Sequence, residues 1–326
     1  MNESETSDIL YPWLKSSYPR IQEVIETSVP KDWPGIRHAV AGLLEGDLPT
    51  ETVLPLASCK AVGVDPKEAT EVTAALLLFA AALRLYDDAV DQDRPGGLWE
   101  QVGSARASNY ATVVHTLVYN VLSKAKLSED KYRALNIFFT DAYINIAAGQ
   151  DKDLAGDTKT VEEYWLTIEL KSGWSYALGC ACGGLVGSDE PELIESCHMY
   201  GYHLGLAKQI MNDYESVWTP DDISDFQQGK TTLPLIYGLN YDHPAKGELL
   251  SYVNENSVQK HEKRIGEILD SIDTKQFLIW AALKEREAAL EALEPCPDVE
   301  GKKALFAYIT GMFGDIDKLL DKTNKG

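Results

Sequence analysis

The sequence is poor in positive charge. It holds 30 lysines and arginines against 51 aspartates and glutamates, for a formal net charge of -21. Nucleic-acid binding requires a clustered basic face, so we expect no nucleic-acid partner. An anionic substrate would have to arrive together with cations. With 326 residues, 44% of them hydrophobic, the chain can still bury a large core.

Cysteine pairs and long apolar runs are also missing. The five cysteines lack the paired CxxC spacing of zinc sites, and Cys180 and Cys182 lie in an Ala/Gly/Leu-rich stretch typical of packing. No apolar segment follows a basic start, and the longest apolar run reaches only about ten residues before Arg84, too short to cross a bilayer. We therefore expect a cytoplasmic protein that is not integral to a membrane.

The sequence predicts helices throughout and almost no strand. No stretch alternates apolar and polar residues with turns at strand spacing. Asp65-Pro66 and Thr160–Glu163 are typical helix starts. We find no repeat or linker, and predict one all-α domain over residues 1–326. The expected helices span roughly 66–92, 99–126, 128–152, 160–187, 190–218, 231–239, 257–270, 274–293 and 298–321, with shorter ones before residue 62.

A cluster of aspartates directly follows the most apolar of these helices. In LYDDAVDQD (85–93), Asp87 and Asp91 are four residues apart and share a helix face, with Asp88 beside them. Such close like charges repel one another unless a cation binds between them. Magnesium suits the site, because it prefers one or two carboxylates completed by water and phosphate oxygens. The alternative is a solvated helix end.

A second set of oxygen-bearing side chains lies in AKQIMNDYESVW (207–218). Gln209 and Asp213 are four residues apart, as are Asn212 and Ser216. Between the two sets, ELKSG places Lys171 in an otherwise apolar helix, and QQGKTTLPL places Lys230 before another one. A lysine in apolar surroundings is costly unless it meets an anion. Together these residues predict a diphosphate held through magnesium above an apolar cavity.

The ordered motifs FAAALRLYDDAVDQD, AAGQDKD, ELKSG, LGLAKQIMNDYES and SDFQQGKTTLPLIY resemble the trans-isoprenyl diphosphate synthases (polyprenyl synthetases) over roughly residues 66–240. The resemblance implies an isoprenoid-synthase fold, an antiparallel helix bundle around a central apolar cavity, and a homodimer. It also implies magnesium, expected as three ions, and an allylic prenyl diphosphate substrate. The residues it implicates are Asp87, Asp88, Asp91 and Asp213 for metal, Lys171 and Lys230 for diphosphate, and Gln209, Gln150 and Asp153 as further motif members.

The second motif departs from the family pattern. Where the family has DDxxD, this chain has Asn212-Asp213-Tyr214-Glu215-Ser216. Asn212 and Ser216 resemble the Asn/Ser metal ligands of class I terpene cyclases, although the acidic third member appears one place late, at Asp221. We therefore expect Asn212 and Ser216 to join Asp213 as metal ligands.

The basic residues that grip a second diphosphate are missing. The family's paired arginines fall at Gly96 and Gly97, which leaves only Arg94 nearby for a diphosphate. Its GGKxxRP element falls on residues 49–55, where only Pro55 matches and Glu51 replaces a lysine. Each lost charge-assisted contact is worth roughly 1.5–3 kcal/mol, so isopentenyl diphosphate should bind poorly.

These features lead to an expected activity. Asp87, Asp91 and Asp213 are the expected catalytic residues for ionising the allylic diphosphate, and the carbocation would then cyclise or be quenched, as in a terpene synthase. One alternative is transfer of the prenyl group, either to another acceptor, as in the bacterial pheromone-peptide prenyltransferases that DDAVDQDRPGGLWEQV also resembles, or to isopentenyl diphosphate in ordinary elongation. A non-catalytic subunit of a two-chain synthase is the alternative of another class.

The expected cavity lies beneath the first aspartate motif. One and two turns before Asp87 stand Leu83, Ala82 and Phe79. In the related synthases an aromatic residue at the first level limits the chain to fifteen carbons. Ala82 would leave that level open, so we expect geranylgeranyl diphosphate as the substrate. The alternative is that this helix is alanine-rich only for packing.

Overall fold

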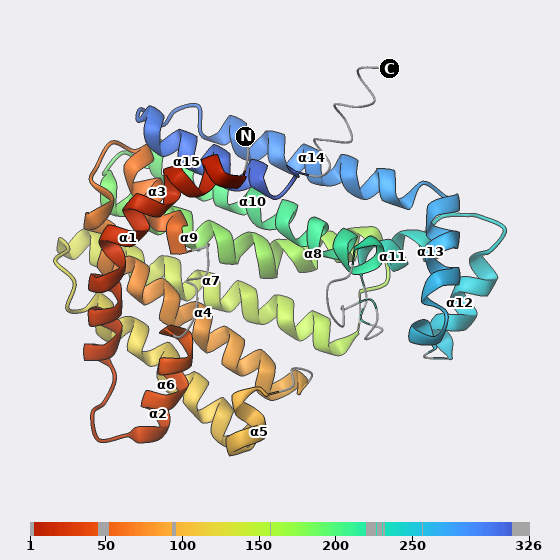
Figure 1. The fold of residues 1–326 in the computed structure, drawn as a ribbon, viewed down its shortest axis with the longest axis horizontal. Helices are drawn as coiled ribbons and strands as arrows, with labels where there is room; N and C mark the ends of the chain where they lie inside the picture. Colours follow the sequence, from red (N-terminus) through yellow and green to blue (C-terminus); the bar gives the residue numbers. More distant parts are fainter. Residues whose placement is uncertain are drawn as a thin grey trace.

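The computed structural model describes residues 3–44, 52–92, 96–156, 158–219, 226, 230, 232–255 and 257–314, with the side chains from Ser16 onward except those of residues 42–44 and of Asp91. These residues form helices joined by short connections, and no strand occurs among them (Figure 1). The prediction of an all-α fold is therefore confirmed. The helices are α1 (Glu3–Ser28), α2 (Pro34–Leu44), α3 (Val53–Ala61), α4 (Thr70–Asp91), α5 (Leu98–Val102), α6 (Ser104–Leu122), α7 (Glu129–Ala155), α8 (Val161–Ile168), α9 (Trp174–Gly187), α10 (Pro191–Trp218), α11 (Leu233–Asn240), α12 (Lys246–Asn254), α13 (Glu262–Ser271), α14 (Thr274–Ala292) and α15 (Val299–Gly311).

The capping residues explain several helix starts. Asp65 accepts a hydrogen bond from the backbone N–H of Lys67 ahead of the short 3-10 turn Pro66–Ala69. At the predicted start of α8, Thr160 and Glu163 form a reciprocal capping box, because each side chain accepts a backbone N–H of the other residue. These local signals place the first turns correctly without help from the rest of the chain.

Three predicted helices differ from the structure. The helix expected over 99–126 is two helices, since Gly103 adopts a φ of 83° that ends α5 and redirects the chain into α6. The stretch 160–187 is interrupted by a π-helical turn, Glu169–Gly173. The last helix, expected over 298–321, covers Val299–Gly311 as α15, and residues 315–326 lie outside the described part. Helix α12 was not predicted.

Helix α4 runs through the middle of the bundle. One side packs on α1 and α6, where Leu78, Ala82 and Leu85 join a core with Val114 and Val118 of α6. The segment Pro66–Val90 is long and apolar enough to cross a membrane, but most of it is buried inside the bundle, as a core helix is. The five cysteines are free and buried, which agrees with a packing role.

Glycines bring α3, α9 and α10 unusually close together. A Cβ on Gly183 of α9 would lie 2.1 Å from the carbonyl oxygen of Pro55 in α3. A Cβ on Gly201 or Gly205 of α10 would lie 2.4 Å from the carbonyl of Tyr176 or 2.2 Å from that of Ser172. Since any side chain would push these backbones apart, the glycines set the spacing of three helices around the site described below.

A smaller cluster extends the bundle at one end. Helices α11, α12 and α13 lie together at the right of Figure 1. They enclose an apolar core of their own that includes Leu235, Leu249 and Ile265. Arg264 of α13 holds both carboxylate oxygens of Glu248 in α12 at 2.8 Å, which lowers the pKa of that carboxyl to about 2.

The close approach of α3 and α9 can be tested by substitution. Gly183→Ala should destabilise the protein by about 1–3 kcal/mol, because the added methyl forces two backbones apart. Gly266→Ala is the control, since nothing lies within 4 Å of its Cβ position on α13. It should be neutral or stabilise the helix by up to about 1 kcal/mol. Urea denaturation of both variants measures the difference, and equal midpoints would refute the packing argument.

Candidate functional site

The acidic end of α4 forms one side of the candidate site. Asp87 and Asp88 lie half-buried near the end of the helix, and Asp91 is its last residue. The helix ends at Gln92, which takes a left-handed φ of 53°. No basic residue occurs in the last turn. A helix C-terminus carries partial negative charge, so carboxylates there are unfavourable unless a cation neutralises them.

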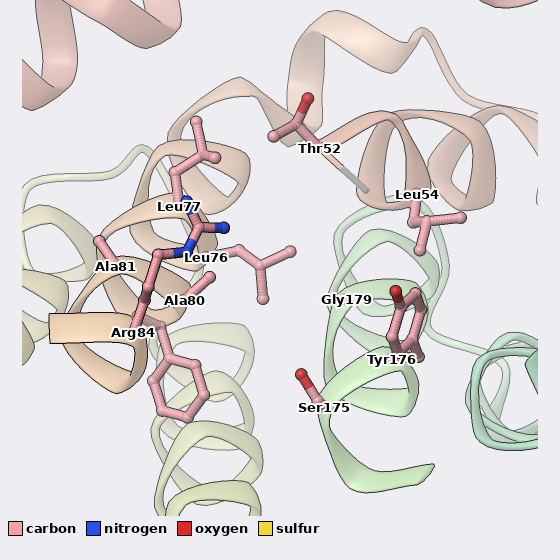
Figure 2. Close-up of a pocket in the computed structure, with 11 residues that line it drawn as sticks. Thr52, Leu54, Leu76, Leu77, Ala80, Ala81, Arg84, Ser175, Tyr176 and Gly179 are labelled. Carbon is pink, nitrogen blue, oxygen red and sulfur yellow. The ribbon is translucent and has the colours of Figure 1, made fainter. Parts of the chain in front are cut away.

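An apolar cavity opens beside this helix. Its volume is about 230 Å³, and its walls come from α3, α4 and α9 (Figure 2). At about 100° per residue, Ala80 lies within roughly 20° of Asp87 around α4, and Arg84 within roughly 20° of Asp91. The cavity and the aspartates therefore share one face of the helix. The lining residues are Thr52, Leu54, Leu76, Leu77, Phe79, Ala80, Ala81, Arg84, Ser175, Tyr176 and Gly179.

The cavity lies on a different side of α4 from the one predicted. Of the three expected lining residues, Phe79 takes part, whereas Ala82 and Leu83 are absent from the lining. Ala82 is 3% exposed and packs in the core shared with α6. It lies roughly 140° from Asp87 around the helix, because five residues make almost one and a half turns. This cavity therefore does not include Ala82 or Leu83, and their place in a substrate cavity stays a prediction.

Phe79 forms a rigid part of the cavity wall. Its ring packs against Phe139, with centroids 5.5 Å apart, and against His115 at 5.9 Å and Tyr143 at 6.2 Å. Burial lowers the pKa of His115, so its imidazole is neutral near pH 7. These aromatic rings fill the space between α4, α6 and α7.

The π-helical turn Glu169–Gly173 holds another of the predicted site residues. It carries Lys171, whose ammonium donates a hydrogen bond to Asp153 of α7. Gly149 makes room for this approach, because a Cβ there would lie 2.6 Å from Cγ of Lys171. The sequence indicated that Lys171 must meet an anion, and in the structure a carboxylate of the GQDKD segment meets it.

Asp213 is buried and hydrogen-bonded within the protein. It is 3% exposed, and its carboxylate accepts hydrogen bonds from two side chains and one backbone N–H. Its Oδ2 accepts from the Tyr164 hydroxyl at 2.8 Å and from the backbone N–H of Leu233 at 2.7 Å. Its Oδ1 accepts from the amide of Gln209 at 2.9 Å. A carboxylate occupied in this way has little capacity left for a cation, which argues against the predicted role.

The other predicted residues of the second motif separate. Asn212 is exposed, whereas Ser216 is buried and donates its hydroxyl to the backbone carbonyl of Asp213 at 2.8 Å. Their role as metal ligands stays a prediction. Gln209 accepts a hydrogen bond from Ser172 at 3.0 Å, a contact within the protein that the prediction missed. Lys230 is exposed, and Arg94 and Asp221 lie outside the described residues.

The donor set suits a hard divalent cation on the α4 side only. Asp87 and Asp88 offer carboxylate oxygens at the end of a helix that has no basic residue in its last turn. Within the described part of the chain, no three carboxylate, thiol or imidazole side chains gather into a closed metal cage. Magnesium does not need one, because water and phosphate oxygens complete its coordination.

Comparison with known proteins identifies the family. The polyprenyl synthetase family model matches residues 51–272. The chain belongs to the polyprenyl synthetase family. It is 27% identical over 317 residues to the short chain isoprenyl diphosphate synthase of Methanothermobacter thermautotrophicus, covering 92% of this chain and 96% of that protein. It is 24% identical to the tryptophan prenyltransferase ComQ of Bacillus spizizenii, covering 64% and 70%.

Structural comparison agrees with the family. The geranylgeranyl pyrophosphate synthetase of Pyrococcus horikoshii superposes with a TM-score of 0.85 at 21% identity, over 94% of this chain and 98% of that one. This likeness confirms the isoprenoid-synthase fold predicted from the motifs. Family membership places the chain among the prenyltransferases that act on isoprenoid diphosphates.

The position of the cavity can be tested with two alanines of α4. Ala80→Phe should fill the cavity and shift substrate preference towards shorter prenyl chains while leaving stability nearly unchanged, because Ala80 is exposed to the cavity. Ala82→Phe should instead destabilise the protein by about 1–3 kcal/mol, because it overpacks the core. Thermal denaturation and turnover with prenyl diphosphates of ten to twenty-five carbons check both. A chain-length shift in Ala82→Phe alone would restore the original prediction.

Proposed function

We propose that this protein ionises an allylic prenyl diphosphate with a divalent cation bound at Asp87, Asp88 and Asp91, while the prenyl chain occupies the cavity beside α4. One observation carries the proposal: the carboxylates and an apolar cavity of about 230 Å³ share a single helix face. Because Ala82 does not line this cavity, the proposal names allylic diphosphates as a class without a chain length.

Each wall of the site has a distinct task in this proposal. The α4 carboxylates would hold magnesium, which supplies charge stabilisation to the departing diphosphate. Leu76 and Phe79 exclude water from the prenyl chain. Lys171 and the exposed Lys230 would contact the diphosphate. Lys171 would exchange its contact with Asp153 for the substrate oxygens, or bind both.

The cavity bears on the fate of the carbocation. Arg84 is the sole cation among the described residues that line it. Thr52 and Leu54, which fall in the segment aligned with the family's isopentenyl diphosphate element, contribute a hydroxyl and an isobutyl group there. A second diphosphate would need several cations to offset its charge. We therefore propose that the cation cyclises or is quenched without a second diphosphate, as in a terpene synthase.

Transfer to an acceptor is the second candidate. The curated relatives reported above are an isoprenyl diphosphate synthase and a tryptophan prenyltransferase. Arg84 favours this candidate, because its guanidinium extends along the cavity wall in Figure 2 and could hold one anionic group of an acceptor. The two candidates share the ionisation step and differ only in what captures the cation.

The ionisation step predicts a specific mutational effect. Asp87→Asn should lower magnesium-dependent diphosphate release by on the order of a hundredfold, the scale expected for losing one charge-stabilising group. Folding should be intact, since one of several repelling charges is removed. Asp141→Asn on the exposed face of α7 is the control and should keep full activity. Normal turnover in Asp87→Asn would refute the metal site.

The capture step predicts the labelling pattern of the product. With an allylic diphosphate and labelled isopentenyl diphosphate, the product should be an unlabelled hydrocarbon or alcohol, identified by mass spectrometry. Label in a longer diphosphate would establish elongation. A prenylated tryptophan in an added peptide, with no product from the diphosphate alone, would establish transfer to a peptide.

A further inference from the structure

Asp213 accepts hydrogen bonds from three different elements: Tyr164 of α8, Gln209 of α10 itself and Leu233 at the start of α11. Tyr164 is 4% exposed, so this contact is shielded from water. Burial, together with the charge of Asp213, raises the pKa of Tyr164 well above its usual value, and the phenol therefore stays a donor.

The contact with Leu233 makes Asp213 the cap of another helix. Leu233 is the first residue of α11, and Thr232 before it provides no side-chain hydrogen bond to the helix. A helix N-terminus carries partial positive charge and unpaired N–H groups, which favour an anion. The Asp213 carboxylate occupies this position from α10. It thereby fixes the start of α11, three residues after Lys230.

The same carboxylate sets the direction of a chain of hydrogen bonds. An ionised carboxylate can only accept. Gln209 must therefore turn its NH2 towards Asp213, which leaves its carbonyl oxygen to accept from Ser172. Ser172 lies in the π-helical turn directly after Lys171, and Gly205 allows its backbone to approach α10. The negative charge on Asp213 thus fixes the orientation of Gln209, and through it that of Ser172, which is next to Lys171 in the sequence.

We propose that Asp213 is a positioning residue rather than a metal ligand. It orients Gln209 and Ser172 on one side of the site and anchors the first turn of α11 on the other. The expected effect on turnover rests on the proposed function. The anchoring of α11 and the orientation of Gln209 and Ser172 do not depend on it. Asp213 is the aspartate that this chain keeps in the second motif, and in this proposal it links α8, α10 and α11.

Removal of one donor tests the proposal without touching Asp213. Tyr164→Phe should lower kcat about tenfold, the scale of one hydrogen bond to a charged group, and leave KM and the magnesium concentration for half-maximal activity unchanged. Tyr200→Phe is the matched control: Tyr200 is equally buried and donates to the carbonyl of Leu305, far along the chain from these residues. Equal kcat in the two variants would overturn the proposal.

Replacement of the carboxylate separates positioning from metal binding. Asp213→Asn places an NH2 group opposite either the Gln209 amide or the two donors on Oδ2, so the chain of hydrogen bonds must break or reverse. Its kcat should fall while its magnesium requirement stays that of the wild type. Asp87→Asn should raise that requirement. A raised requirement in Asp213→Asn would show that Asp213 binds metal and would overturn the proposal.

Hydrogen–deuterium exchange distinguishes failure of this inference from failure of the proposed function. Exchange of the backbone amides over 233–240 should rise at least tenfold in Asp213→Asn and Tyr164→Phe, and stay unchanged in Tyr200→Phe. This holds even if wild-type protein releases no diphosphate from any allylic substrate, an outcome that would overturn the proposed function alone. Unchanged exchange in Asp213→Asn would overturn the anchoring of α11.

Discussion

Three carboxylates at the C-terminal end of an apolar helix are the constraint on which this molecule depends. Their mutual repulsion and the helix dipole both oppose the last turn of α4. The helix persists because its other side is buried against α1 and α6 over most of its length. The core thus holds these acidic residues together at one end of the helix. One side of α4 therefore stabilises the fold, and the other carries the proposed chemistry.

The two halves of the site use acidic residues in opposite ways. On α4, Asp87 and Asp88 lie half-buried on the helix face that also lines the cavity. On α10 the carboxylate of Asp213 is buried and satisfied by donors of the protein. A family pattern of paired acidic motifs therefore becomes asymmetric in this chain. Substitution by Asn212 and Ser216 leaves one aspartate in the second motif, and its carboxylate accepts hydrogen bonds from other parts of the protein.

The cations are divided in a similar way. Lys171 already contacts Asp153, whereas Arg84 stands in the cavity lining. The net charge of the chain is -21, yet Arg84 places a positive charge among leucines and alanines of the cavity. In the proposed function, this charge would favour an anionic group beside the prenyl chain. Helix α9 carries Ser175, Tyr176 and Gly179 of the same lining. The close glycine contacts of α9 with α3 and α10 therefore fix the position of this wall of the cavity.

The sequence alone determined the helices, the family and the acidic end of α4, because periodicity, capping and motif order are local properties. Asp65, Thr160 and Glu163 start their helices as predicted. Tertiary structure decided what local patterns leave open: which side of α4 faces the cavity, and which partner a polar group finds. Ala80 and Ala82 belong to the same run of alanines, and the local sequence does not distinguish them. Ala82 lies in the core because it packs against α6, whereas Ala80 lines the cavity, which α9 closes on the other side. Asp213 has the spacing of a ligand, but Tyr164 and Leu233, distant in sequence, complete its hydrogen bonds first, because a buried carboxylate must be satisfied wherever the fold places it.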